Sequence, residues 1–238
     1  MNTFNIATDW WQLVVMALVS YLVGCVNFAK IISLSKKRDI TTIGSGNPGT
    51  MNMSREFGLK IGILTFLLDV LKGGIPGLVT FFIYRGVTFA GTQIWVSDLT
   101  RYLCGLFVII GHIFPVTMGF KGGKGIASTF GMFWIGLSCE SPWFILIGLG
   151  ISVCMLLFIA WTEWGSLGSL TGVSIFTIVQ VVIFILRYQS IFSLYLVALY
   201  VIIFLVSVLT WAAHKENLVR LFAGEEHRTS IKKLAKKK

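Results

Sequence analysis

Two lysines lie among glycines in a short polar segment between two apolar stretches. Residues 120–125 read FKGGKG and follow GHIFP at residues 111–115. Glycines such as Gly122 and Gly123 let backbone N–H groups approach a phosphate closely, and a helix starting after the loop adds a positive dipole. Lys121 and Lys124 supply formal charge. The segment therefore favours an anion-binding loop, and the alternative is a flexible basic turn beside a membrane.

A second polar, glycine-rich segment carries donors that suit oxyanions. Residues 44–55 read GSGNPGTMNMSR. The planar guanidinium of Arg55 matches phosphate bidentately, and Ser45, Asn47 and Asn52 can complete a cage without adding net charge. The alternative is an Asn-Pro-Gly turn followed by a helix that begins at Asn52 or Ser54.

A third segment, residues 214–226, reads HKENLVRLFAGEE and contains a histidine near the C-terminus. Helical spacing places His214 and Asn217 on one face. Alone, the segment is equally typical of an ordinary helix end, because a single histidine is more often structural than catalytic. The segment indicates a functional site only in combination with the two glycine-rich segments.

In this order the segments GSGNPGTMNMSR, GHIFPVTMGFKGGKGIAS and HKENLVRLFAGEE resemble the three motifs of the PlsY family, bacterial membrane glycerol-3-phosphate acyltransferases that use acyl phosphate. DVLKG at residues 69–73 adds a local similarity. The chain departs from the family pattern at Thr41, where an arginine is usual, and at Thr50–Met51, where the family has Ala-Thr. These departures put fine contacts of the first loop in question, while Ser45, Asn52 and Arg55 are kept.

The resemblance implies that the primary hydroxyl of glycerol 3-phosphate attacks the carbonyl carbon of an acyl phosphate, which gives 1-acylglycerol 3-phosphate and inorganic phosphate. Two phosphate groups must then be held close together, and fixed donors stabilise the charge of the transition state. The residues expected in catalysis are Ser45, Arg55, Lys124 and His214. Those expected to bind substrate are Ser45, Asn47, Asn52, Arg55, Lys121, Gly122, Gly123, Lys124, His214, Asn217 and Glu226.

Two groups could accept the hydroxyl proton: His214, whose unperturbed pKa is suitable, or a bound phosphate. Acyl phosphate is already activated, so we expect direct transfer with no covalent acyl-enzyme and no cofactor. The four cysteines and three histidines lack metal-ligand spacing, so no metal is expected. The expected partners are glycerol 3-phosphate, acyl phosphate, membrane lipids and the enzyme that makes acyl phosphate, but not nucleic acid.

Composition independently indicates a membrane protein. Apolar residues make up 55% of the 238-residue chain, charged residues only 13%, and the mean hydropathy is +0.83. The sequence predicts an all-α, integral membrane helical bundle formed by one domain, residues 1–238, with a basic tail at residues 222–238. Seven apolar spans are expected, and most are long enough to cross a bilayer as helices of roughly 20 residues. They lie at residues 10–32, 61–84, 102–118, 126–138, 143–161, 164–186 and 191–213.

The distribution of basic residues gives the orientation. With seven spans, most of the 20 lysines and arginines face one side, and Arg85, Arg101 and Arg187 face the other. The positive-inside rule then places the N-terminus outside, and the C-terminus and all three motifs on the cytoplasmic face of the bacterial cell membrane. The span at residues 126–138 is short enough to be re-entrant, but six spans would put the third motif across the membrane from the others.

Alternatives to this interpretation remain open. Asp69 and Lys72 lie three residues apart within an apolar span, which favours a structural ion pair over a role in attracting phosphate. An organic-phosphate transporter could also use a cationic cytoplasmic mouth, although polar groups near the bilayer midplane would then be expected. An acyl-CoA or acyl carrier protein donor is not excluded.

Overall fold

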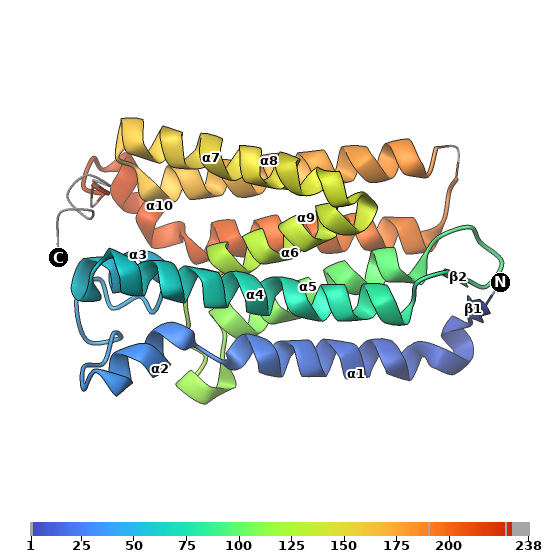
Figure 1. Cartoon of the computed structure of the whole chain (residues 1–238), viewed down its shortest axis with the longest axis horizontal. Helices are drawn as coiled ribbons and strands as arrows, with labels where there is room; N and C mark the ends of the chain where they lie inside the picture. Colours follow the sequence, from blue (N-terminus) through green and yellow to red (C-terminus); the bar gives the residue numbers. More distant parts are fainter. Residues whose placement is uncertain (1, 190, 227, 230–238) are drawn as a thin grey trace.

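The computed structural model describes residues 2–189, 191–226 and 228–229, and helices dominate it. The long helices lie side by side along one axis of the molecule (Figure 1). The helices are α1 (Ile6–Cys25), α2 (Phe28–Ser35), α3 (Thr50–Phe57), α4 (Leu59–Ile83), α5 (Val96–Ile113), α6 (Ile126–Glu140), α7 (Ile145–Thr162), α8 (Gly165–Arg187), α9 (Leu194–Ala213) and α10 (Lys215–Phe222). Two 3-10 turns, Val116–Met118 and Pro142–Phe144, precede α6 and α7.

The bundle contains one small exception to the all-α prediction. Strands β1 (Asn2–Phe4) and β2 (Val87–Phe89) pair in parallel, with Phe4 opposite Phe89. The two rings meet edge to face, with centroids 5.6 Å apart, and both are buried. This short pairing ties the N-terminus to the loop between α4 and α5 at one end of the molecule (Figure 1).

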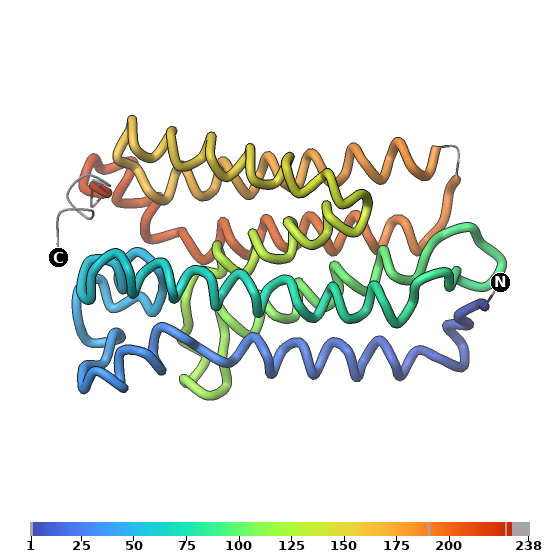
Figure 2. Tube along the Cα trace, viewed as in Figure 1, coloured from blue at the N-terminus to red at the C-terminus, as the bar shows by residue number. Residues whose placement is uncertain are grey.

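Six helical segments of the described chain are long and apolar enough to cross a membrane, against the seven that were predicted. The exception is the fourth predicted span, which is the 15-residue helix α6. At 1.5 Å per residue α6 is about 22 Å long, short of a hydrocarbon core of about 30 Å. α6 ends part-way along the bundle, where the chain turns into α7 (Figure 2).

The first predicted span is not one continuous helix. α1 ends at Cys25, and α2 begins after Asn27, whose side-chain oxygen accepts a hydrogen bond from the backbone N–H of Lys30 at 2.8 Å. Asparagine is a favoured N-cap, so it starts a new helix here. The Lys72 ammonium of α4 donates to the carbonyl of Val26 at 2.7 Å and thereby satisfies an acceptor freed by the break.

α5 begins six residues before the predicted span, because its charged first turns are buried in ion pairs. Arg101 was expected to face the membrane surface, but only 2% of its side chain is exposed. It pairs with Asp98 at 3.2 Å and contacts Glu140, the last residue of α6, while Arg187 of α8 binds Glu140 at 2.5 Å. Buried charges are tolerated when they are paired in this way. The most apolar stretch of α5 is 72% buried, against 17–39% for the other five candidate spans, so α5 is the central helix.

Glycines bring α6 against α4 at van der Waals distance. A Cβ at Gly131 would lie 1.9 Å from the carbonyl oxygen of Val70, and one at Gly73 would lie 2.0 Å from that of Ser128. Small residues at such crossings allow helix backbones in a membrane to approach closely. The contact fixes α6, and with it the glycine-rich loop that precedes it.

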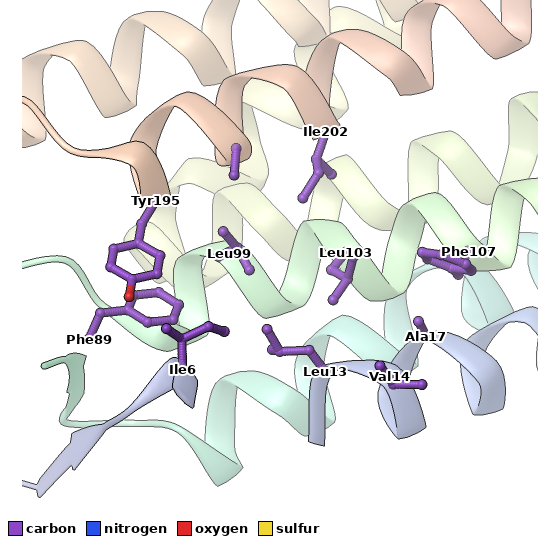
Figure 3. Close-up of a pocket in the computed structure, with 11 residues that line it drawn as sticks. Ile6, Leu13, Val14, Ala17, Phe89, Leu99, Leu103, Phe107, Tyr195 and Ile202 are labelled. Atoms are coloured by element: carbon purple, nitrogen blue, oxygen red, sulfur yellow. The ribbon is translucent and has the colours of Figure 1, made fainter. Parts of the chain in front are cut away.

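An apolar groove lies between α1, α5 and α9, near the end of the bundle that carries β1 and β2 (Figure 3). Its volume is about 360 Å³. The rings of Phe89 and Tyr195 stack at one end of it, with centroids 4.0 Å apart. Apolar and aromatic side chains line it, so the chemistry expected from the sequence must lie elsewhere.

Candidate active site

A second cavity, of about 520 Å³, collects most of the predicted site residues. Its polar walls come from the loop before α3, from the starts of α3, α6, α8 and α10, and from the chain after α10. α3 and α10 lie at the end of the molecule opposite the N-terminus (Figure 1). Eight of the eleven predicted substrate-binding residues line it: Ser45, Asn47, Asn52, Arg55, Lys124, His214, Asn217 and Glu226.

Four helix N-termini meet at this cavity, and within the described ranges none of them is capped by a side chain. The lining includes the first residues of each helix or the residue before them, namely Gly49 and Thr50 for α3, Gly125 and Ile126 for α6, Gly165 and Ser166 for α8, and His214 and Glu216 for α10. Each N-terminus carries partial positive charge and unsatisfied N–H groups. Their convergence makes the cavity suitable for more than one anionic group.

Lys124 and Arg220 converge on one side-chain oxygen. Both bind Oδ1 of Asn217, Lys124 in a very short contact and Arg220 at 3.0 Å. The pKa of Lys124 is lowered to about 8, chiefly because burial removes water from the ammonium and further because Arg220 is close. Glu216 and Glu226 oppose this shift. An anion that binds here would relieve the repulsion between the two cations.

Arg220 is the site residue that sequence analysis did not single out. It lines the cavity and lies three residues after Asn217 on α10, so both share a helix face. The same spacing rule that related Asn217 to His214 could have identified it. Its guanidinium adds a third cation to those of Arg55 and Lys124.

Arg55 reaches the cavity from the last turn of α3. Its guanidinium donates to the Thr229 hydroxyl at 3.1 Å, and burial lowers its pKa while the charge of Glu226 opposes the shift. Thr229 is buried, and its backbone N–H donates to the carbonyl of Glu163 at 2.7 Å. The chain after α10 therefore lies across the cavity and contacts a predicted phosphate ligand.

Asn52 holds the first loop in shape. Its Oδ1 accepts from the backbone N–H of Ser45 at 3.1 Å, and its amide donates to the carbonyls of Ile43 at 3.0 Å and Ile40 at 3.3 Å. Asn52 is only 1% exposed, so these bonds replace those it would make with water. The helix begins at Thr50, two residues before the earliest start expected for it.

Local bonds replace the arginine that the family pattern has at position 41. Thr41 donates from its backbone N–H and its hydroxyl to the Asp39 carboxylate, at 2.9 and 2.7 Å. These bonds lower the pKa of Asp39. The departure therefore leaves Asp39 with local partners, and the loop that follows still presents Ser45 and Asn47 to the cavity.

Three predicted residues of the glycine-rich loop are not among the described residues that line the cavity. The backbone N–H groups of Gly122 and Gly123 donate to the carbonyls of Ile113 and His112, each at 3.0 Å, so they are already engaged. Left-handed backbone at Gly119 and Phe120 turns the chain back toward α5 and leaves Lys121 exposed. Of the loop's two lysines, only Lys124 faces the cavity.

His214 lies at the junction of α9 and α10 and is 4% exposed. Its Nδ1 lies 2.7 Å from the carbonyl oxygen of Thr210. A carbonyl only accepts, so Nδ1 carries the proton and Nε2 is left as an acceptor. Burial lowers the pKa of His214 to about 4, the nearby Lys124 charge adds to the shift, and the Thr210 bond opposes it. The imidazole is therefore neutral at neutral pH.

Asp69 and His112 form the deep side of the cavity. Asp69 pairs with Lys72 at 2.8 Å, and His112 Nδ1 lies 3.8 Å from the same carboxylate oxygen. Lys72 itself holds the break between α1 and α2 and is not among the described lining residues. The structural interpretation of the Asp69–Lys72 pair is therefore favoured over direct attraction of phosphate by Lys72.

Known proteins with the same features were found by sequence and by structure. A family model described as glycerol-3-phosphate acyltransferase matches residues 14–224. The glycerol-3-phosphate acyltransferase of Aquifex aeolicus is 33% identical over 90% of this chain and 97% of its own length. That of Finegoldia magna is 34% identical over 92% of this chain and 96% of its own length.

Two crystal structures of PlsY, an integral membrane glycerol 3-phosphate acyltransferase, share the fold. The glycerol 3-phosphate form has a TM-score of 0.71 and the lysophosphatidic acid form 0.69, both at 30% identity over 91% of this chain and 95% of theirs. With a family model that spans most of the chain, these matches confirm the resemblance found in the three motifs. The chain belongs to the glycerol-3-phosphate acyltransferase family of PlsY membrane proteins.

Proposed function

We propose that this protein transfers a fatty acyl group from acyl phosphate to the sn-1 hydroxyl of glycerol 3-phosphate. The products are 1-acylglycerol 3-phosphate, which is lysophosphatidic acid, and inorganic phosphate. The observation that carries the proposal is the single cavity in which three cations and four helix N-termini surround a space that is apolar on its other side. Such a space suits two phosphate groups and one hydrocarbon tail.

The cationic side holds the phosphates. Arg55 of α3, Lys124 of the glycine-rich loop and Arg220 of α10 all line the cavity, and the last two bind Asn217. This arrangement offers separate ligands to the phosphate of glycerol 3-phosphate and to that of the donor. Ser45 and Asn47 add neutral donors. Fixed positive groups in a partly dry site stabilise the charge that gathers on the carbonyl oxygen and on the leaving phosphate.

The hydroxyl of glycerol 3-phosphate attacks the carbonyl carbon, the bond from that carbon to the phosphate oxygen breaks, and the phosphate leaves with the bonding electrons. A neutral His214 with a pKa near 4 is a weak base, but its Nε2 can accept a hydrogen bond and orient a glycerol hydroxyl, together with Asn217. The proton then passes to a phosphate oxygen. No covalent enzyme intermediate and no cofactor are required.

The apolar side receives the acyl chain. Side chains of α4, α6 and α7 line it, namely Phe66, Ile126, Phe130, Met155, Leu156 and Ile159. Leu156 is half exposed, and its neighbour on α7, Leu157, is 64% exposed, so this wall of the cavity belongs to a largely exposed apolar helix. A membrane-dissolved acyl phosphate could enter from that side with its head group directed to the cations.

We also propose that the chain is one domain that crosses a bacterial cell membrane seven times, with α6 as the short fourth span. The N-terminal strand and the α3–α10 end lie at opposite ends of the long axis, as an odd number of crossings requires (Figure 1). The positive-inside rule then places the cavity at the cytoplasmic face. Residues 230–238 of the basic tail lie outside the described residues. The enzyme that makes acyl phosphate is a candidate partner of the protein.

The test uses purified protein in detergent with glycerol 3-phosphate and palmitoyl phosphate, palmitoyl-CoA or no donor. Phosphate release matched one-to-one by 1-acylglycerol 3-phosphate, with palmitoyl phosphate alone, supports the proposal. Product formed from palmitoyl-CoA would change the donor. Folded protein that binds glycerol 3-phosphate but yields no product would favour transport, which uptake into vesicles would measure.

A further inference from the structure

Just beyond the residues that line the apolar side of the cavity lies one indole ring, which packs against the lining residue Phe66. Phe130 lines the cavity from α6, and Trp134 follows it one helical turn deeper. Trp134 lies between two other helices. Its ring meets that of Phe66 of α4 edge to face, with centroids 6.4 Å apart, and its Nε1–H donates to the hydroxyl of Ser152 of α7 at 3.1 Å. The side chain therefore bridges α4 and α7.

The indole fits closely on both sides. A Cβ at Gly148 of α7 would lie 2.9 Å from Cδ1 of Trp134, so the ring lies directly against the α7 backbone. The Ser152 hydroxyl that accepts its N–H also donates to the carbonyl of Gly148 at 2.8 Å, which fixes the acceptor. Trp134 is thus held in one orientation by a ring contact, a hydrogen bond and a glycine.

The direction of the helices places this ring deep in the bundle. α6 starts at the polar end of the cavity, and Ile126, Phe130 and Trp134 follow at intervals of four residues on one face. From Ile126 to Trp134 the helix rises about 12 Å. α7 runs the opposite way, and Ser152 lies about 10 Å deeper than Ile159 along it. Both helices therefore place the indole beyond the lining residues Phe130 and Met155.

We propose that Trp134 is a specificity-determining residue that limits the length of acyl chain that can lie straight inside the protein. The proposal rests on the proposed function, in which this side of the cavity holds the tail of the donor. A tail longer than the space above the indole must turn out between α4 and α7 into the lipid. The limit is steric. The tail lies in a hydrocarbon environment both inside the protein and in the lipid, so moving it from one to the other changes its free energy little.

The substitution Trp134→Ala removes the ring beyond the lining residues and opens the path along α6. We expect the ratio of kcat/KM for stearoyl phosphate to that for lauroyl phosphate to rise roughly tenfold, the lower end of the discrimination that one methylene gives in a fitted pocket. The KM for glycerol 3-phosphate should stay unchanged, because the cationic side is untouched. Trp161→Ala is the matched control, since that indole is 83% exposed near the end of α7.

A second variant covers the case in which Trp134→Ala does not fold. Trp134→Phe keeps a ring against Phe66 but loses the bond to Ser152, so it should shift the ratio in the same direction by a smaller factor. An unchanged ratio in a folded variant, or an equal shift in Trp161→Ala, would overturn the proposal. The series is run with whichever donor the wild-type protein accepts, acyl phosphate or acyl-CoA. If the wild type uses only acyl-CoA, the proposed donor is wrong, but the effect of Trp134 on chain length can still be measured. A wild-type protein that accepts neither donor overturns both.

Discussion

At the level of single residues, the state of His214 separates the two candidate proton acceptors. Its Nδ1 is bonded to the Thr210 carbonyl, and burial lowers its pKa to about 4, so the imidazole stays neutral above that pH. An imidazole with a pKa this low is a weak base at neutral pH, so it is better suited to orienting a hydroxyl than to accepting its proton. The phosphate groups of the substrates then remain as the acceptors.

This assignment predicts that His214 does not titrate between pH 5 and pH 8 in the ligand-free protein. Ring signals of the three histidines, His112, His214 and His227, can be followed by NMR with the His214→Gln variant as the assignment control. A lowered pKa keeps the ring neutral across this window, so its chemical shifts should be flat. An inflection near the usual value of about 6.5 would restore His214 as a general base.

Most of the site residues predicted from the three motifs line the cavity, because cationic, amide and hydroxyl side chains among glycines have few other uses at a membrane surface. The direction of each side chain could not be predicted in the same way. Left-handed backbone at Gly119 and Phe120 sends Lys121 outward, while Lys124 faces Asn217. Such turns depend on the packing of the loop against α5, which the local sequence does not specify.

At the level of elements, the sequence predicted the positions of the long helices well, because long apolar runs leave few alternatives in a membrane. The short fourth span was expected from its length, but the break after α1 and the early start of α5 were not. Each of these two features depends on a tertiary contact: Lys72 on the Val26 carbonyl, and Asp98 paired with Arg101. Apolar run length alone cannot anticipate polar groups that are paired in the interior.

The contact between α4 and α6 positions the start of α6 at the cavity, so its loss should impair both stability and turnover. Gly131→Ala places a methyl group where the Val70 carbonyl lies, and we expect a cost of about 1–3 kcal/mol from overpacking, seen as a lower midpoint of thermal unfolding. Gly150→Ala on α7 is the control, because a Cβ there meets nothing within 4 Å. Equal midpoints for the two variants would contradict this account of the helix contact.

At the level of the whole molecule, the polar cavity and the N-terminal strand lie at opposite ends of the bundle (Figure 1). A water-soluble phosphate must therefore arrive from one side of the membrane only. In the proposed topology of seven crossings, the loops before α3 and α6 lie on that side, together with the chain after α9. The loop at Gly91, between α4 and α5, then faces the other side.

The orientation predicts which positions react with a membrane-impermeant maleimide on intact cells. In a cysteine-free background, Gly91→Cys should be labelled from outside, because a Cβ there meets nothing within 4 Å and points into open space. Lys121→Cys should be labelled only after the membrane is permeabilised. Labelling of both positions in intact cells, or of Lys121→Cys alone, would contradict the proposed topology.

The proposed place where the two phosphate groups react is the cavity surrounded by helix N-termini, and the two lysines of the glycine-rich loop distinguish this cavity from the exposed surface. Lys124 lies in the cavity and Lys121 is exposed outside it, three residues away. The measurement is kcat/KM for donor-dependent phosphate release by wild-type, Lys124→Ala and Lys121→Ala proteins of equal thermal stability. We predict a loss of about 100-fold or more for Lys124→Ala, the scale of a lost transition-state donor, and a change of at most about twofold for Lys121→Ala. Near-normal turnover in Lys124→Ala, or equal losses in both variants, would contradict the account.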